Sequence, residues 1–197
     1  MGKPKVTDTD HGWRDILKTA VELGEGSYTK VGILGGSEDR GGLHQTDPTT
    51  GKSAPLTIAE IALVNEYGTE DGHVPARPAH RMTFDTMRAE LAEDSRKLLI
   101  KVVLDRTMTV EQALNILGLK LATGIKRTIT SGAGVPPPNA PSTARAKVPA
   151  SSTGAKRQKA IDGARPLVDT GATLNAISWA TFLGTVRAST RYLTGKK

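Results

Sequence analysis

The stretch that most constrains this chain runs from Leu56 to Arg81, LTIAEIALVNEYGTEDGHVPARPAHR. Thr57 followed three residues later by Glu60 is a capping box, which marks the first turn of a helix. The helix carries the apolar residues Ile58, Ile61, Ala62 and Val64 and is expected to end at Gly68. The two prolines that follow fix the next segment as extended, because each restricts the residue before it. The stretch therefore predicts a capped helix joined to a rigid turn.

A second stretch of this kind runs from Pro166 to Trp179, PLVDTGATLNAISW. Asp169 or Thr170 can cap a short helix that continues through Asn175, because both side chains can accept a hydrogen bond from a free backbone N–H. The chain should then continue as a hairpin of Ile177–Leu183 and Val186–Tyr192. Gly184-Thr185 is a glycine-first pair of the kind that joins two strands in a tight turn.

Two long helices are predicted between these stretches. The first spans roughly residues 83–106, and a second capping box, Thr109 with Gln112, starts the next. The expected buried residues are Phe84, Met87, Leu91, Leu98 and Val102 in the first helix, and Val110, Ala113, Leu114, Leu117, Leu121, Ile125 and Ile129 in the second. Two amphipathic helices joined by a short link favour an antiparallel pair.

The N-terminal part predicts a helix and a strand. Asp10 can cap a helix over Gly12–Leu23, and Tyr28–Leu34 alternates like a strand. The polar, glycine-rich residues 35–55 are too many for a simple loop, which favours a contact loop or an extended hairpin. The fold class is therefore α+β: a small antiparallel sheet packed with several helices, including a long antiparallel pair.

Residues 132–165 differ from the rest, since prolines interrupt them and Ala, Ser and Gly fill them. We interpret them as a basic arm or loop inserted into a single domain made of residues 1–131 and 166–197. Residues 1–131 hold 17 Lys and Arg against 18 Asp and Glu, whereas residues 132–197 hold 10 against 2. A neutral body with a basic final third indicates a polyanion or an acidic protein as neighbour, or a solvated arm.

The 197 residues include no cysteine, which excludes a disulfide scaffold, a thiol nucleophile and cysteine-bound metal. No signal peptide or membrane-spanning run is evident. We therefore expect a soluble protein of a reducing cytosol, without a membrane partner.

Three motif matches suggest chemistry that the rest of the chain does not support. Asp169-Thr170-Gly171 copies the D-T-G signature of aspartic proteases, but only 26 residues follow Gly171, too few to complete such a barrel. Gly51-Lys52-Ser53 lacks the first glycine of a P-loop. Gly32 to Gly36 lacks the G-x-G-x-x-G spacing of a dinucleotide site.

The histidines are His11, His44, His73 and His80, and none has the spacing of a metal ligand pair. We therefore predict no catalytic, cofactor-binding or metal-binding residues, no cofactor and no enzymatic activity.

The order of the motifs resembles the tail-completion and neck protein families of tailed bacteriophages. A strand ending V-G-I-L-G-G precedes T-I-A-E-I-A-x-x-N-E-Y-G-T and P-A-R-P. Two helices follow, then Pro137 to Thr143 as P-x-N-x-x-S-T, and Pro166 to Ile177 as P-L-x-D-T-G-x-L-x-x-S-I with one extra residue, Thr173. Ala79-His80 stands where the family usually has a bulky apolar residue.

The resemblance implies a structural virion protein at the head–tail junction, in the neck or at the tail end, as a head–tail connector, tail-completion or tail-terminator subunit. It implies assembly in the host cytoplasm into a ring of six-fold or twelve-fold symmetry. The partners would be other copies of the chain, the portal or connector, and tail proteins.

On this hypothesis the candidate subunit-interface residues are Tyr67, Pro75, Arg77, Pro78, Asp169, Thr170 and Gly171. The candidate contacts to DNA in the channel, or to an acidic neighbour, are Arg145, Lys147, Lys156, Arg157, Lys159 and Arg165. The alternative hypothesis is a basic nucleic-acid-binding protein, although no recognised DNA-reading motif is present.

Overall fold

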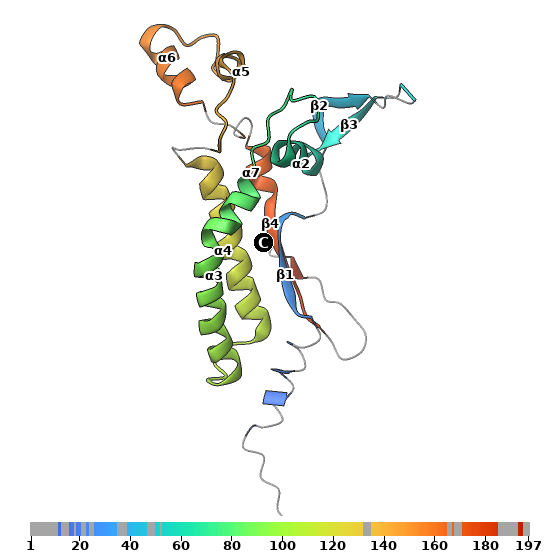
Figure 1. Cartoon of the computed structure of the whole chain (residues 1–197), viewed down its shortest axis with the longest axis vertical. Helices are drawn as coiled ribbons and strands as arrows, with labels where there is room; N and C mark the ends of the chain where they lie inside the picture. The colour runs from blue at the N-terminus through green and yellow to red at the C-terminus, as the bar shows by residue number, and fades with distance from the viewer. Residues whose placement is uncertain are drawn as a thin grey trace, which may run out of the picture.

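A computed structural model of the chain describes residues 12, 16–17, 19–20, 23, 26–34, 39–46, 50–51, 53–131, 135–164, 167, 171–184 and 193–194. Within them a three-stranded antiparallel sheet packs against a pair of long antiparallel helices (Figure 1). A hairpin and an arm of two short helices project from the same end of this body. The fold is α+β, as the sequence predicts.

The sheet has the order β1-β4-β5 and joins distant parts of the chain. β1 (Tyr28–Ile33) pairs antiparallel with β4 (Ile177–Phe182), with Val31 opposite Trp179. β5 (Leu193–Thr194) pairs with the other edge of β4, so that Ala180 lies opposite Thr194. The predicted pairing across Gly184-Thr185 does not match this register, in which Thr181 lies opposite Leu193, and the predicted second strand Val186–Tyr192 lies outside the described residues.

The long helices are α3 (Ala79–Val103) and α4 (Val110–Thr130). α3 begins earlier than predicted because its first turn is stabilised from outside the helix, as described below. The predicted buried stripe is confirmed at Leu98 and Val102, but Phe84 is half exposed and Ala79 and Thr83 take its place. In α4 the capping box of Thr109 and Gln112 forms, and Val110, Ala113, Ile125 and Ile129 are buried as predicted.

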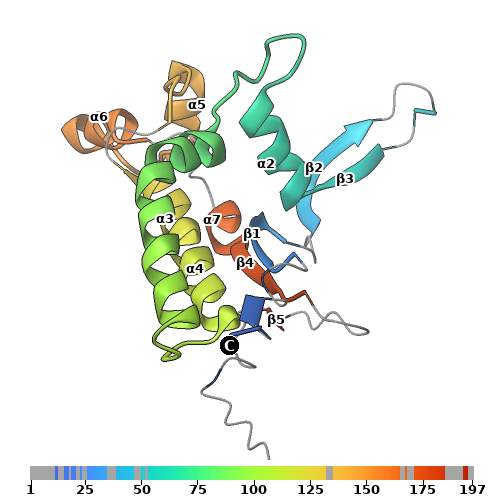
Figure 2. The ribbon, with the colours of Figure 1, turned by 60° about the horizontal axis from the view of Figure 1, so that its bottom comes forward.

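One face of the sheet lies on α4 (Figure 2). Ala122, Ile125, Ile129 and Ile177 form the main core with Ala79 and Val135, and Val31 and Trp179 pack against them. Asn115 of α4 ties the two layers by a polar contact, since its Oδ1 accepts hydrogen bonds from Trp179 Nε1 (3.2 Å) and Thr181 Oγ1 (2.9 Å). A second cluster of Leu98, Val102, Val110 and Ala113 holds the far ends of the helix pair together.

The sequence predicts either a contact loop or an extended hairpin between β1 and the first capped helix, and the structure has a hairpin there. β2 (Asp39–Thr46) pairs antiparallel with β3 (Ser53–Thr57). β3 runs directly into α2 (Ile58–Tyr67), whose capping box forms between Thr57 and Glu60. The hydrogen bonds from Thr57 lower the pKa of the Glu60 carboxyl.

The region predicted as an arm does stand off the body, but it contains two short helices, α5 (Pro141–Ala146) and α6 (Gly154–Asp162). They pack on each other, with Ala144 and Val148 buried. α7 (Ala172–Ala176) agrees with the predicted short helix, although both of its predicted caps lie outside the described residues. The structure describes six residues of the predicted N-terminal helix, and all but the first are helical: Gly12, Ile16, Leu17, Thr19, Ala20 and Leu23.

Close contact between α4 and its neighbours depends on two glycines. A Cβ at Gly118 would lie 2.7 Å from Trp179 Cδ1 and 2.8 Å from Thr29 Oγ1. A Cβ at Gly124 would lie 2.3 Å from Met87 Sδ. Met87 is flexible and can move aside, whereas Trp179 and Thr29 are fixed within the layer between sheet and helix.

We predict that Gly118→Ala destabilises the protein although alanine favours a helix by about 1 kcal/mol. The cost of overpacking is about 1–3 kcal/mol, which exceeds that gain. Gly124→Ala is the matched control and should be near neutral or stabilising. Urea unfolding of the two variants and the parent measures this, and equal midpoints for the two variants would contradict it.

Candidate functional site

The sequence motifs converge on one junction, between the end of α2, the first turn of α3 and the base of the arm. Its central residue is Glu66, whose side chain is only 11% exposed. Glu66 Oε2 accepts the backbone N–H of His80 (3.0 Å), and Oε1 accepts that of Arg81 (3.0 Å). His80 Nδ1 lies 3.1 Å from Glu66 Oε2.

This carboxylate provides the cap that α3 lacks. Pro78 occupies the N-cap position and has no side-chain acceptor. The first N–H groups of a helix have no partner within it and carry a partial positive charge. A carboxylate from α2 satisfies two of them and complements that charge, so Glu66 fixes the angle between α2 and α3.

The turn between the two helices is closed by its own backbone. Gly68 has φ 77°, and a Cβ there would lie 2.8 Å from both Ala76 N and Val74 O. Thr69 N donates to Val74 O (3.0 Å), and Arg77 N donates to Asn65 O (2.7 Å). Hydrogen bonds from Thr69 and the backbone of His73 lower the pKa of Asp71, which strengthens the turn when this carboxyl is ionised.

Arg77 connects the turn to the arm. Its Nε donates to Pro137 O (2.9 Å) and its Nη2 to Pro138 O (3.2 Å). Burial lowers the pKa of this guanidinium. At the same base, Asn139 Nδ2 donates to Ala164 O (2.9 Å) and closes the arm into a loop. The P-A-R-P and P-x-N motifs thus contact each other within one chain.

The predicted interface residues therefore divide into two groups. Arg77 and Pro78 hold the junction of their own chain together, whereas Tyr67 and Pro75 are exposed. Gly171 has the left-handed conformation (φ 78°) at the start of α7, which explains the glycine of D-T-G. Asp169 and Thr170 lie outside the described residues.

The predicted basic contacts also differ from one another. Arg145, Lys156 and Lys159 are exposed on the arm. Arg157 is engaged within the arm, since its Nη1 donates to Pro149 O (3.0 Å) and Ser152 O (3.4 Å). Lys147 is partly buried, and Arg165 lies outside the described residues.

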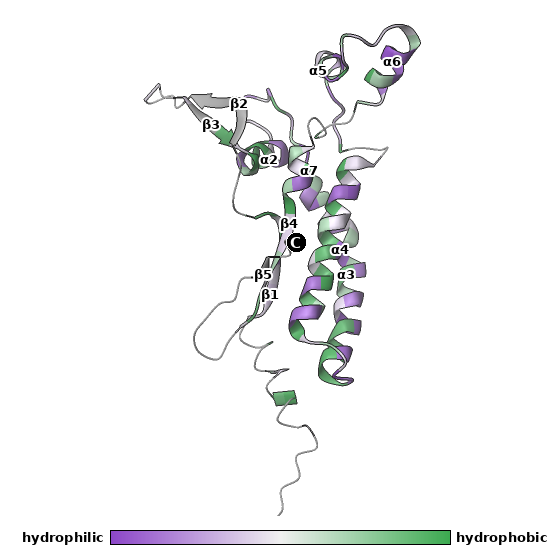
Figure 3. Cartoon of the chain, turned by 180° about the vertical axis from the view of Figure 1, so that it is seen from behind, coloured by the Kyte–Doolittle hydropathy of each residue, from purple (hydrophilic) through white to green (hydrophobic). Residues whose placement is uncertain are grey.

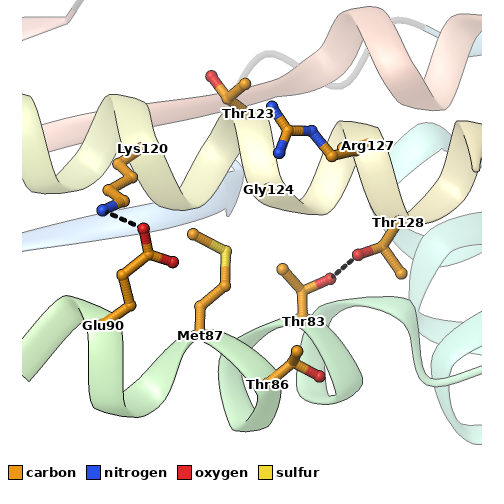
Figure 4. A pocket seen from close by; sticks show the side chains of 9 residues that line it. All are labelled: Thr83, Thr86, Met87, Glu90, Lys120, Thr123, Gly124, Arg127 and Thr128. Atoms are coloured by element: carbon orange, nitrogen blue, oxygen red, sulfur yellow. Dashed lines mark hydrogen bonds and ion pairs between the residues drawn. The ribbon is translucent and has the colours of Figure 1, made fainter.

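A further hollow lies elsewhere, as an open groove of about 490 Å³ between α3 and α4 (Figure 4). Thr83 Oγ1 donates to Thr128 Oγ1 (2.7 Å) at one end. At the other end Lys120 pairs with Glu90 (2.6 Å) and with Asp94. Those two carboxylates, Asp94 first, raise the pKa of Lys120. The groove is lined by Glu90, Lys120 and Arg127 and by four threonines.

Across the residues that the structure describes, no three His, Asp or Glu side chains form a cluster that could hold a metal ion. Nor is any helix in this part of the chain long and apolar enough to cross a membrane. Comparisons with protein families, with curated proteins and with solved structures found no match.

Sequence reasoning missed Glu66 and Asn139 as junction residues. Glu66 stands next to Tyr67 near the end of a helix, and nothing local indicates that it caps a different helix. Asn139 belongs to the P-x-N motif, which does not indicate a partner for its side chain. Their partners are 14 and 25 residues away, which is beyond the reach of capping patterns.

We predict that Glu66→Gln lowers the free energy of unfolding by about 1–3 kcal/mol, because an amide offers one acceptor where the carboxylate offers two. Glu70→Gln is the control, since Glu70 is exposed and should change stability by less than about 0.5 kcal/mol. Urea unfolding measures both. Equal loss in the two variants would argue against a cap at α3.

We predict that Arg77→Lys loosens the arm and leaves the body folded, because an ammonium cannot reproduce the two-pronged contact with two carbonyls. Hydrogen exchange should rise in residues 141–162 and stay unchanged in α4. Arg88→Lys, on the exposed side of α3, is the control. Unchanged exchange in the arm of the Arg77 variant would show that this contact does not hold it.

Proposed function

We propose that this chain is a structural subunit of a tailed bacteriophage, placed at the head–tail junction or tail end, and that it assembles as a cyclic ring of six-fold or twelve-fold symmetry. The observation that carries the proposal is the order of four motifs along the chain: Leu56–Thr69, Val74–Arg81, Pro137–Thr143 and Pro166–Ile177. Its partners would be further copies of the chain, the portal or connector, and tail proteins.

The geometry supports this proposal because three of those motifs form the junction from which the hairpin and the arm project. Glu66 and Arg77 join α2, α3 and the arm by charge-assisted hydrogen bonds. The β2–β3 hairpin and the α5–α6 arm project from the end of the body where this junction lies (Figure 1). A subunit that works by shape needs such elements fixed at their base and free at their tips to meet neighbours.

A second candidate, binding to nucleic acid, is favoured by the arm. Residues 135–164 hold five Lys or Arg and one acidic residue, Asp162. Arg145, Lys156 and Lys159 are exposed there and can contact phosphates. Affinity for duplex DNA that falls steeply with salt would favour this candidate, because phosphate contacts release counterions. Absent or salt-insensitive binding would favour an acidic protein neighbour.

The test of the proposal is genetic and visual. Deleting the gene from its phage should leave filled heads and tails that do not join, or tails with abnormal ends, as seen by electron microscopy. Supplying the unaltered gene in trans should restore joined particles. Infectious, normally joined particles from the deletion would contradict the proposal and promote the nucleic-acid candidate.

A further inference from the structure

Two apolar patches are exposed in the part of the chain that the structure describes, and they lie at opposite ends of α3. The first is on α2, where Leu63 is 59% exposed and Tyr67 64% exposed. The second is at the end of α3, where Leu99, Ile100 and Leu104 are 46%, 47% and 69% exposed. We infer that these two patches bind each other between neighbouring copies of the chain.

The α2 patch has the features expected at the centre of a protein interface, namely exposed apolar side chains and an ordered tyrosine beside a hollow. α2 is apolar on nearly all sides, yet only Ala62 is buried among its residues, and an all-round apolar helix is normally covered. Leu63 and Tyr67 are one turn apart and border a hollow of about 220 Å³ next to Ile33. The guanidinium of Arg81 lies 5.3 Å from the Tyr67 ring and holds it in place. An ordered tyrosine beside a hollow is typical of residues that dominate binding.

The patch at the end of α3 forms a continuous arc. Successive residues of a helix are about 100° apart, so Ile100 and Leu104 share the side opposite the buried Leu98 and Val102, and Leu99 lies at the edge between the two sides. Arg106 Nη2 donates to Gly12 O (2.7 Å) at this end of the body, and the three apolar side chains stay exposed beside that contact. Figure 3 shows green, hydrophobic residues mixed with purple, hydrophilic ones along the α3–α4 pair down to this lower end.

Charge makes the two patches complementary. Residues 59–71, which include the α2 patch, contain four acidic residues and no basic one, and Arg81 is a basic side chain that reaches the patch from α3. Residues 96–106, around the other patch, contain four basic residues and one acidic one. An apolar centre with opposite charges around its rim is the usual anatomy of a specific protein interface. Contact between two copies of the same patch would instead bring like charges together.

The patches cannot meet within one molecule. Glu66 ties α2 to the first turn of α3, whereas Leu104 follows the last, and 25 helical residues span about 37 Å. Each copy therefore offers one patch to the neighbour on each side, which is a heterologous contact that closes into a ring or extends as a filament. The inference deepens the proposed ring and rests on that proposal for its setting.

The natural absence of cysteine allows a direct test. The purified double variant Leu63→Cys/Leu104→Cys, treated with a short bis-maleimide linker, should give a ladder of covalent multimers. The single variants should give no ladder, and mixing them should give covalent dimers containing one of each. The matched control is Leu63→Cys/Leu119→Cys, because Leu119 is an exposed leucine on α4 outside both patches.

Replacement of Leu63 or Leu104 by serine should weaken self-association about tenfold in sedimentation experiments without changing the unfolding midpoint. Leu119→Ser should have no effect on association. Oligomers that form without links between positions 63 and 104, or linked pairs from one single variant alone, would overturn this inference and leave the ring proposal standing. A protein that stays monomeric at all concentrations would overturn it too, whereas the ring proposal is judged by the phage deletion.

Discussion

The arrangement of this molecule depends on the carboxylate of Glu66 at the start of α3. Proline at the N-cap leaves the first turn of a 25-residue helix without a local acceptor. Two hydrogen bonds from that turn to Glu66 fill this role and join α2, with the hairpin that leads into it, to the helix pair. Arg77 then extends the same connection to the carbonyls of Pro137 and Pro138. Every projecting element is thus oriented by one small polar junction at the edge of the core.

The elements that the sequence predicts well are those whose signals are local. The capping boxes at Thr57 and Thr109 satisfy free N–H groups three residues away, so their patterns identify α2 and α4 directly. The pairing of β1 with β4 depends on contacts between residues about 150 apart, such as Val31 and Trp179, and no local pattern announces it. Phe84 was expected in the core on its periodicity, but the small pair Thr83 and Thr128 occupies the seam there and lets the helices approach closely.

The sequence identifies several residues of the candidate site, but it predicts less well which partner each of them contacts. Arg77 is predicted to anchor a neighbouring subunit, because arginine suits fork-like pairing with carboxylates. The structure gives it a fork-like contact, with carbonyls of its own chain. The prolines predict the arm, yet α5 and α6 form inside it. Pro141 occupies the first turn of α5, where proline is favoured, and α6 is rich in the helix formers Ala, Lys, Arg and Gln. Exposure then distinguishes Lys156 and Lys159 from Arg157, which forms hydrogen bonds within the arm.

The internal use of Arg77 bears on where copies of this chain would meet. A junction that is already satisfied by its own hydrogen bonds has little to gain from a partner, because each new contact would replace an existing one. Leu63, Tyr67 and Leu104 expose apolar area that a partner can cover without breaking anything. If copies assemble as proposed, the free energy for this would come from residues beside the motif junction, on α2 and at the far end of α3. On this argument the motif residues set the angle of α2, and through that angle they set the direction in which the next copy would bind.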